Sequence, residues 1–314
     1  MSDRINVSII LVSYNTCNLT IETIKSIYAR TRDISYEIIL VDNNSTDDTV
    51  LKVRSLFPSV LCIENKDNKG FGAANNIGAS IARGNYLFLL NTDTVLLVNA
   101  VKILSDYLDC PENSDVVAVG GNLYDINGNP TSSYSRLFPG VCCEINGLLF
   151  NLFHQFKFFN YFFNYTSSPI KFRGSISGAD SMIRKEWFDK VKGFDEDFFL
   201  YYEETDLFYR LVRNGFFVSS IPEAKIIHLE GGSESVREIT LERSFKSKFI
   251  YLSKHSTKIK ANIIHRLYQL TCTVRILIFC FVKKEAKKSY WSILKRIENE
   301  VYLTMRNKNG KRKN

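Results

Sequence analysis

Short apolar runs alternate with amphipathic stretches along the first 120 residues of the chain. The apolar runs, rich in Val, Ile and Leu, occupy residues 7–12, 37–41, 60–64, 86–90 and 116–120. Unbroken runs of this length are typical of strands buried on both faces, and therefore of a parallel sheet. Apolar residues at helical spacing occupy the stretches between them, 18–30, 47–57, 73–82 and 95–108. This alternation predicts an α/β fold with a doubly wound, mostly parallel sheet.

A polar cluster follows each of the first four predicted strands, either directly or within the loop after the strand. They occupy residues 13–15, 42–44, 68–72 and 91–93. In an open α/β sheet, ligands bind beyond the carboxyl ends of the parallel strands, where such clusters come together. We therefore expect one binding site that is built from all four clusters.

The alternation stops near residue 122. Residues 150–165 contain nine Phe or Tyr and one charged residue, Lys157. A further strand is expected at 221–229, and helices rich in Lys and Arg are expected from residue 241 onward. The pattern predicts an α/β domain over 1–240, with an aromatic-rich insert at about 141–170, and a basic helical extension over 241–314.

Composition and charge narrow the class of protein. The 314 residues are 45% hydrophobic and 24% charged, a globular balance that excludes disorder as the main state. The net charge of +8 arises after residue 282, because residues 283–314 hold 11 Lys or Arg against 3 Glu. A neutral body with a basic tail points to an anionic partner, either a membrane surface or nucleic acid.

The seven cysteines and the apolar segments bear on the compartment. No two cysteines have CxxC spacing, which favours reduced thiols in the cytoplasm. The first residues lack the apolar region of a signal peptide. The most apolar part of the helical extension, 270–282, is short for a membrane span and contains Arg275. We expect a cytoplasmic protein without a transmembrane helix.

Asp42 and Asp93 are candidates for chemistry that each have a structural alternative, and a third segment resembles a dinucleotide motif. Asp42 can accept a hydrogen bond from a nucleobase or a ribose, or it can close a turn and cap the next helix. Asp93 can hold Mg²⁺ or Mn²⁺ together with diphosphate oxygens, or it can cap the next helix. The glycine-containing segment 69–78 has Asn75 where a nicotinamide fingerprint needs a glycine, so we expect no dinucleotide site there.

Residues 194–207 interleave six carboxylates with aromatic side chains. Glu203, Glu204 and Asp206 fall in the first turn of an expected helix, where acidic residues compensate the helix dipole. Neighbouring aromatic rings can also desolvate a carboxylate, which raises its pKa and suits it to general-base catalysis. His228 ends a strand just before a Gly-Gly pair, and it is either a structural residue or a metal ligand.

In combination, these segments resemble a GT-A-fold family 2 glycosyltransferase of the subgroup that includes rhamnosyltransferases. The matching motifs, in family order, are VSIILVSYN at 7–15, VDNNSTDDT at 41–49, NKGFGAANNIG at 68–78, LLNTDT at 89–94, the segment 178–211, and HLEGGS at 228–233. The resemblance implies an inverting transfer of a sugar from a nucleotide-diphospho-sugar to a hydroxyl of an acceptor. It covers about residues 5–235.

The resemblance also implies roles for particular residues. Asp42 corresponds to the residue that reads a pyrimidine base, Asp93 to the last acid of the metal motif, and His228 to a histidine that can complete the metal site. The base position holds Glu204, which is one methylene longer than the usual Asp. The nucleotide-binding residues are expected to be Ser13, Asn15, Asp42, Asn44, Asn68, Gly70, Asn75 and Asn91. The sugar and acceptor residues are expected to be Gly178, Ala179, Asp180 and Glu203.

A divalent cation, Mg²⁺ or Mn²⁺, is the cofactor that the resemblance implies. The implied donor is a dTDP- or UDP-sugar, with dTDP-rhamnose favoured over UDP-hexoses and UDP-galactofuranose. The implied acceptor is a glycan, polyprenyl-linked, in surface polysaccharide synthesis. The aromatic segment and the basic tail favour an enzyme at the inner face of the cell membrane and no nucleic-acid partner. Core packing or a subunit interface is the alternative for the aromatic segment.

Three other classes account for parts of the sequence. A sugar nucleotidyltransferase would need a Gly-rich, basic loop after the first strand, where residues 13–16 read Ser-Tyr-Asn-Thr. A lipid- or nucleic-acid-binding module would explain the basic tail but not the six carboxylates. A catalytically silent family member would be consistent with Glu204 at the base position.

Overall fold

The computed structural model describes residues 5–150, 167–229 and 238–311. The aromatic-rich segment 150–165 therefore lies outside the described residues apart from Phe150. The chain packs into two compact units. The sheet unit comprises residues 1–136, 161–196 and 203–233, and the helical unit comprises 137–160, 197–202 and 234–314.

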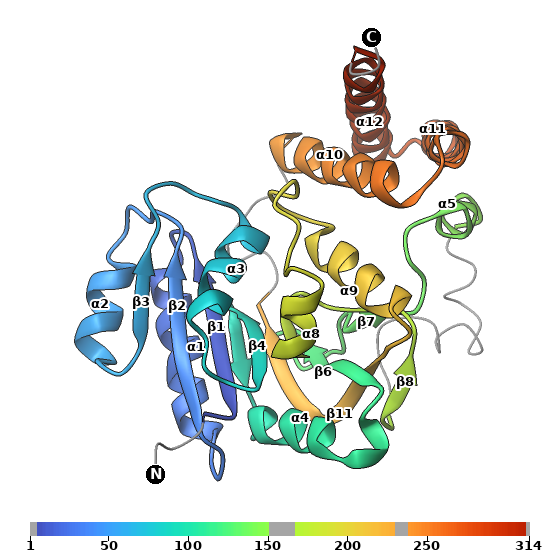
Figure 1. Ribbon diagram of the computed structural model, residues 1–314. Helices are drawn as coiled ribbons and strands as arrows, with labels where there is room; N and C mark the ends of the chain where they lie inside the picture. The colour runs from blue at the N-terminus through green and yellow to red at the C-terminus, as the bar shows by residue number, and fades with distance from the viewer. Residues whose placement is uncertain (1–4, 151–166, 230–237, 312–314) are drawn as a thin grey trace. The chain divides into compact units, whose positions relative to one another are not determined.

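A mixed, mostly parallel sheet is the centre of the sheet unit (Figure 1). The strands that share one direction are β1 (Val7–Ser13), β2 (Tyr36–Asp42), β3 (Leu61–Glu64), β4 (Tyr86–Asn91), β6 (Val116–Tyr124) and β11 (Phe217–His228). The strands that run against them are β5 (Thr94–Leu96), β8 (Ile170–Phe172) and β10 (Asp180–Arg184). The order across the sheet is β3-β2-β1-β4-β10-β6-β11-β5, and β8 pairs with β11.

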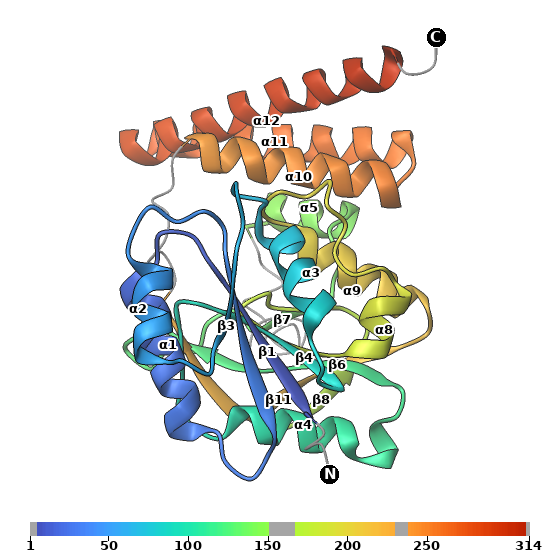
Figure 2. The ribbon, with the colours of Figure 1, turned by 60° about the vertical axis from the view of Figure 1, so that its left-hand side comes forward.

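Helices cover both faces of this sheet (Figure 2). The helices on one face are α1 (Cys17–Arg30), α2 (Thr49–Leu56) and α4 (Ala100–Asp109), and those on the other are α3 (Phe71–Ile81), α8 (Lys185–Lys190) and α9 (Glu203–Arg213). Successive residues of a strand point to opposite faces. Ile9 and Leu11 accordingly join the core that contains Ile24 of α1, whereas Ile10 lies against Gly78 of α3. Double burial explains the continuous apolar runs at residues 9–12 of β1 and 38–41 of β2.

The sheet differs from the sequence prediction in its antiparallel strands, because β5, β8 and β10 were not predicted. The predicted helix at 95–108 begins only at Ala100, because Val95 pairs with Ile227 in a short antiparallel strand and Asn99 caps the helix. The antiparallel strand β10, between β4 and β6, was not predicted. Its sequence, DSMIR, is neither a continuous apolar run nor a strict alternation, so periodicity carries no signal for it.

Smaller elements complete the sheet unit. A short 3₁₀ helix spans Pro111–Asn113, and β7 (Tyr134–Ser135) pairs with β9 (Ser175–Ile176) in a separate two-stranded sheet.

The helical unit contains α5 (Val141–Leu148), α10 (Glu238–His255), α11 (Lys258–Phe281) and α12 (Glu285–Lys311). Both views place α11 alongside α12 (Figure 2). Buried polar contacts join these two helices: His265 Nδ1 lies 3.0 Å from Glu298 Oε2, and Gln269 Nε2 donates to the Lys295 carbonyl at 3.0 Å. Among the described residues, α11 is the one helix whose length and composition would suffice to cross a membrane, which is weak evidence by itself.

Candidate active site

The loops after β1 and β2 form a closed hydrogen-bond network around Asp42. This carboxylate is 3% exposed, and its Oδ1 accepts from the hydroxyls of Ser13 (2.7 Å) and Ser45 (2.6 Å). Its Oδ2 accepts from the Ser45 backbone N–H at 2.8 Å. Three of the roughly four acceptor positions of the carboxylate are thus taken by Ser13 and Ser45. Asp42 therefore closes the turn, as the structural alternative expected, but it does not cap the next helix, whose N-cap is Asp48. One position on Oδ2 is left for a ligand.

Asn15 holds the first loop against the second. Its side-chain oxygen accepts from the Thr46 backbone N–H at 2.7 Å, and its own N–H donates to Ser45 Oγ at 2.9 Å. Asn15 and Asn44 both have positive φ, 55° and 65°, which asparagine tolerates better than most residues. A hollow of about 520 Å³ beside these loops is lined by residues 15–19, 46–48 and Lys52.

The loop before α3 is tied to the end of β2. Asn43 Nδ2 donates to the carbonyl of Gly70 at 3.1 Å, and Asn68 Oδ1 accepts from the Gly70 N–H at 2.9 Å. Gly70 has φ 85°, a conformation that favours glycine. Asn75 is 1% exposed and donates to the Phe71 carbonyl at 3.0 Å, whereas its Oδ1 has no hydrogen-bond partner among the described residues. Asn75, one of the residues predicted to bind the nucleotide, thus bonds to the backbone of its own helix, α3.

Asp93 and His228 meet at the end of β4. His228 Nε2 lies 3.3 Å from Asp93 Oδ1 and 3.5 Å from Asn91 Nδ2. The antiparallel pairing of β5 with β11 fixes this meeting, because Thr94 is the register partner of His228 and the Leu229 N–H donates to the Asp93 carbonyl at 2.9 Å. The structure therefore brings together two residues that lie 135 positions apart in the sequence.

These two side chains fit one side of a divalent-cation site. A carboxylate oxygen and an imidazole nitrogen are suitable ligands for Mn²⁺, and the side chains are 13% and 14% exposed, so the pair is reachable. In the described part of the chain, no cluster of three or more His, Cys, Asp or Glu is placed to hold a metal. A cation here would take its remaining ligands from diphosphate oxygens and water, as Mg²⁺-type sites commonly do.

The segment before the antiparallel strand β10 lies beside the end of β4. The Asn91 N–H donates to the Ala179 carbonyl at 3.0 Å. Asp180 is fully buried; its Oδ2 accepts from the Gly121 N–H at 2.7 Å, and its Oδ1 has no partner among the described residues. Burial raises the pKa of Asp180 to about 7, although the Gly121 N–H and the charge of His228 act to lower it.

Glu203 and Glu204 begin α9. Glu203 is 4% exposed and its Oε2 has no partner in the described structure, while Glu204 is half-buried. The side chain of Glu204 lies against Gly178, where an added methyl group would stand 3.6 Å from Glu204 Cγ. Burial raises the pKa of Glu203 well above its ordinary value, and the charge of Glu204 raises it further. Burial also raises the pKa of Glu204, against the N–H groups of residues 204 and 205 at the helix start.

A row of neighbouring residues links these parts into one site. Glu204 lies beside Gly178, the Ala179 carbonyl accepts from the Asn91 N–H, Asn91 Nδ2 is 3.5 Å from His228 Nε2, and His228 Nε2 is 3.3 Å from Asp93 Oδ1. The predicted base and the predicted metal ligands thus lie along one edge of the sheet.

Comparison with known proteins identifies the family. A model described as Glycosyl transferase family 2 matches residues 8–191, more than half of the chain. The chain belongs to glycosyl transferase family 2. A second model, described as the N-terminal domain of galactosyltransferase, matches residues 155–231. Its match includes Glu203, Glu204 and His228.

Curated relatives of this family 2 chain include an uncharacterized glycosyltransferase of Rickettsia felis, 25% identical over 277 residues, which are 82% of this chain and 43% of that protein. The UDP-Glc:alpha-D-GlcNAc-diphosphoundecaprenol beta-1,3-glucosyltransferase of Escherichia coli is 36% identical over 28% of this chain and 35% of its own length. A poly(ribitol-phosphate) beta-glucosyltransferase of Bacillus spizizenii is 30% identical over 46% of this chain and 24% of its own length. The chain spans less than half the length of these relatives.

Two solved structures share the fold. The mannosyltransferase of Pyrobaculum calidifontis in complex with GDP-Man and Mn²⁺ has a TM-score of 0.58 at 14% identity, over 96% of this chain and 86% of that chain. GalNAc-T7 with UDP, GalNAc and Mn²⁺ has a TM-score of 0.57 at 17% identity, over 81% of this chain and 48% of that chain. The likeness confirms the predicted GT-A fold with its mixed, mostly parallel sheet and C-terminal helical region.

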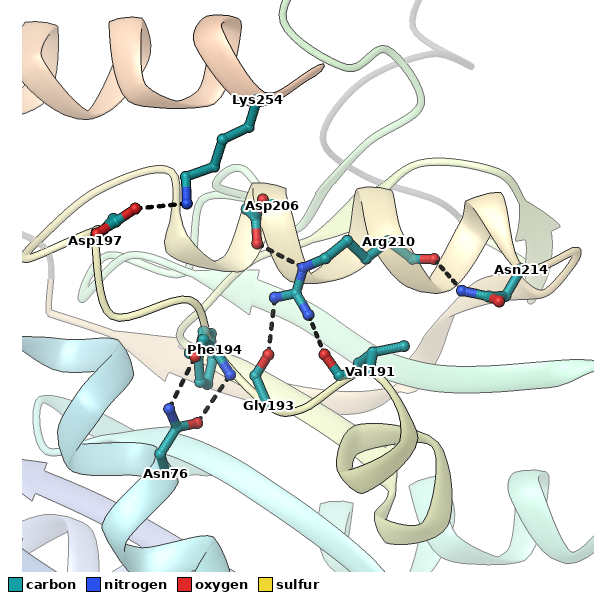
Figure 3. A network of polar contacts seen from close by, with 9 residues as sticks. All are labelled: Asn76, Val191, Gly193, Phe194, Asp197, Asp206, Arg210, Asn214 and Lys254. Atoms are coloured by element: carbon teal, nitrogen blue, oxygen red, sulfur yellow. Dashed lines mark hydrogen bonds and ion pairs between the residues drawn. The ribbon is translucent and has the colours of Figure 1, made fainter. Parts of the chain in front are cut away.

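The segment that leads to α9 in this family 2 chain is held by residues that sequence reasoning missed. Asn76 bonds the Phe194 backbone twice, through Oδ1 at 2.8 Å and Nδ2 at 2.9 Å. Arg210 donates to Asp206 at 2.7 Å and to the carbonyls of Val191 and Gly193 (Figure 3). Asp206, one of the six carboxylates, therefore orients Arg210. The i, i+4 spacing of these two residues is the signal that a helical reading of the sequence offers for this contact.

Within the helical unit, α10 holds loop 197–202, which runs directly into α9. Ser247 Oγ donates to the Leu200 carbonyl at 2.8 Å, and Lys254 pairs with Asp197 at 2.6 Å (Figure 3). Tyr201 and Tyr202 have φ of 69° and 68°, a left-handed conformation that is strained for bulky residues. These contacts hold a strained turn immediately before the two glutamates.

Proposed function

We propose that the chain is an inverting glycosyltransferase that moves a sugar from a nucleotide-diphospho-sugar to a hydroxyl group of a glycan. The observation that carries this proposal is the row of neighbouring residues that runs from Glu204 past Gly178, Ala179 and Asn91 to His228 and Asp93. It joins a carboxylate with a raised pKa to a pair of metal-type ligands. Family membership supports the reaction class.

In the proposed reaction, the carboxylate of Glu204 accepts the proton of the acceptor hydroxyl. The acceptor oxygen then forms its bond to the anomeric carbon while the bond from that carbon to the diphosphate oxygen breaks. The nucleoside diphosphate leaves with the bonding electrons, so a single displacement inverts the configuration. A raised pKa suits Glu204 to this step, because a general base works best when its pKa is near the operating pH.

Asp93 and His228 are the residues that would hold a divalent cation. Such a cation, when bound, offsets the negative charge that builds on the leaving diphosphate. The relatives in fold that were solved with Mn²⁺ support this assignment. The backbone bond between Leu229 and Asp93 keeps the two ligands in place before any ion arrives.

The donor is proposed to carry a pyrimidine base that bonds the remaining acceptor position of Asp42. Uracil and thymine present the same N3–H to a carboxylate, so Asp42 does not distinguish dTDP- from UDP-sugars. dTDP-rhamnose is the donor implied by the sequence motifs. UDP-glucose is a second candidate, favoured by the two relatives that are named glucosyltransferases. The relative that acts on a diphosphoundecaprenol-linked sugar supports a lipid-linked acceptor.

Isothermal titration calorimetry tests this proposal. dTDP-rhamnose, UDP-glucose, UDP-galactose, UDP-N-acetylglucosamine and GDP-mannose are titrated into the full chain with and without Mn²⁺. We expect Mn²⁺-dependent binding of one pyrimidine donor. Binding of GDP-mannose alone would contradict the role of Asp42, and binding that is independent of Mn²⁺ would remove Asp93 and His228 from the metal role.

A catalytically silent protein is the alternative to test alongside. Glu204 in place of the shorter Asp of related sites is the observation that favours it. A silent protein would bind the donor with the same metal dependence but would release no nucleoside diphosphate. A coupled assay for nucleoside diphosphate release distinguishes the two functions, because only the enzyme consumes its donor.

A further inference from the structure

One face of α11 presents apolar side chains along the length of the helix. Ile259 is 74% exposed, Leu277 55% and Phe281 86%, and Ile263 and Leu270 are also exposed. Their spacings of four, seven, seven and four residues place all five on one side of a helix. We call these five residues the α11 stripe. Scattered single apolar residues on a surface are ordinary, but five on one side of a single helix, with exposed Arg266 among them, mark an interaction surface.

The opposite face of α11 is polar where it packs on α12. Glu298 is fully buried beside His265, and Gln269 donates to both Glu298 Oε2 at 2.6 Å and the Lys295 carbonyl. A helix that spans a bilayer would carry these charged neighbours into hydrocarbon, where an ionisable group is costly. This arrangement suits an interfacial helix, which lies in the plane of the membrane surface with its apolar side toward the hydrocarbon.

Basic residues surround the stripe. Residues 258–288 contain eight Lys or Arg and one acidic residue, Glu285. Lys283, Lys284 and Lys287 are exposed directly after Phe281, and Tyr290 is 46% exposed just beyond them. Exposed lysines next to an apolar row and an amphipathic aromatic ring match the chemistry of an anionic lipid surface.

We propose that the α11 stripe and the lysines 283, 284 and 287 form a docking surface for an anionic membrane. Charge selects this occupant over a second copy of the chain. A symmetric pairing through the stripe would bring two segments that are both strongly basic into contact, and like charges oppose such a pairing. A negatively charged bilayer offers both the apolar layer and the opposite charge.

The docking surface goes beyond the proposed reaction and does not depend on it. It would place the helical unit at the surface where a lipid-linked acceptor is found. The glycosyltransferase assays use the dissolved donor, so their failure leaves the docking surface standing, and failure of the docking test leaves the reaction standing.

Vesicle flotation tests the proposal with the full chain. The protein is mixed with vesicles of phosphatidylcholine and phosphatidylglycerol in a 70:30 ratio, or with vesicles of phosphatidylcholine alone. We expect flotation with the anionic vesicles, little with the neutral ones, and release by sodium carbonate at high pH. Absence of flotation with anionic vesicles would overturn the proposal, and resistance to carbonate would show that α11 spans the bilayer instead.

Two variants locate the surface. Leu277→Asp with Phe281→Asp removes the apolar end of the stripe, and we expect at least a tenfold loss of vesicle affinity. The matched control is Leu51→Asp with Ile126→Asp, because these side chains are 70% and 73% exposed in the sheet unit. All four positions are exposed, so circular dichroism and Tm are expected to stay unchanged. Equal loss in both variants would overturn the location.

Replacing lysines 283, 284 and 287 with Gln tests the charge. Each basic residue near an anionic surface contributes about fivefold in affinity, so the triple variant is expected to lose roughly 100-fold. Light scattering after size-exclusion chromatography follows the oligomeric state in parallel. A wild-type dimer that the Leu277→Asp, Phe281→Asp variant converts to a monomer, with vesicle binding unchanged, would contradict the proposal and make the stripe a self-association surface.

Discussion

Asp42 and Asp180 are both buried carboxylates at the same edge of one sheet, yet their surroundings differ. Asp42 accepts three hydrogen bonds from Ser13 and Ser45. Asp180 accepts one, from Gly121, and its other oxygen has no partner among the described residues. Glu203 resembles Asp180 in this respect, with a buried Oε2 that lacks a partner there.

The hydrogen bonds around Asp42 are in place before a ligand binds, whereas Asp180 and Glu203 each keep one carboxyl oxygen without a partner among the described residues. Around Asp42, satisfied hydrogen bonds stabilise the loops and pre-form the surface at which we propose that the nucleotide binds. Around Asp180, Glu203 and Glu204, burial raises the pKa of each carboxyl. Unsatisfied buried acids cost stability and are tolerated where chemistry needs them, so the contrast agrees with proton transfer on this side.

The largest expected effect comes from Glu204→Gln. Gln keeps the size of the side chain but accepts no proton, so turnover of the donor is expected to fall by about 10²–10⁴-fold. Donor affinity, measured by calorimetry, is expected to stay the same. The control is Glu186→Gln, an exposed glutamate in the first turn of α8. Nearly full activity of the Glu204 variant would remove it from the base role.

Asp93→Asn is expected to act on donor binding and not only on turnover. Loss of a ligand oxygen is expected to weaken Mn²⁺-dependent donor binding by on the order of 100-fold. Binding without Mn²⁺ is expected to stay the same. Asp67→Asn, at an exposed aspartate in the loop before Gly70, is the control. A variant that keeps its full Mn²⁺ dependence would place the cation elsewhere.

Asp42→Asn is expected both to destabilise the folded protein and to weaken donor binding. The amide nitrogen would face the Ser45 N–H, two donors in a buried loop, at a cost of about 1–3 kcal/mol. Thermal unfolding measures the first effect and calorimetry the second. Asp48→Asn changes an exposed aspartate of the same loop that makes no capping bond, so we expect it to change neither quantity.

Ser247→Ala tests whether α10 positions the loop before the base. Loss of the bond to the Leu200 carbonyl is expected to reduce kcat by about tenfold while the KM for the donor stays the same, because only the start of α9 is disturbed. Ser253→Ala is the matched control, since that hydroxyl bonds to the Ile250 carbonyl of its own helix. Equal effects of both changes would assign the loss to helix stability instead.

Glu203→Gln is expected to have the smallest effect and the opposite sign to Asp42→Asn. The pKa of Glu203 is raised in the folded protein. Its neutral form therefore favours folding below the ordinary carboxyl pKa, and this contribution is lost as the pH rises through the raised value. The variant is expected to unfold roughly 2–4 °C above the wild type at pH 8 and at the same temperature near pH 4. A lower Tm at pH 8 would contradict the contrast.

Much of the first half of the fold follows from the sequence because β1, β2 and β4 are buried on both faces. Continuous apolar runs such as 7–12 and 37–41 would expose apolar side chains to water anywhere except between two layers of helices. The observed strands extend these runs by one residue at one or both ends. The missed strand β10 is short and mixes charged with apolar residues, and its position between β4 and β6 depends on pairing across distant segments. Long-range pairing of this kind has no local signal.

The site shows the same division. Asp42, Asp93, Glu204 and His228 were predicted from motifs, but the contacts of their side chains were not predicted. Asn15 and Asn75 are predicted to bind the nucleotide; in the structure the Asn15 side chain accepts from the Thr46 N–H, and the Asn75 side chain donates to the Phe71 carbonyl. Asn76 was missed because a single Asn on a helix gives no sequence signal for a partner that lies 118 residues away.

The anomeric configuration of the first sugar released tests the central claim most directly. In the absence of an acceptor, water takes its place and the donor is slowly hydrolysed, and ¹H NMR observes the anomer before it equilibrates. A single displacement assisted by Glu204 predicts that the inverted anomer appears first. First appearance of the retained anomer would contradict the account, because it requires a second displacement or attack from the side of the leaving group.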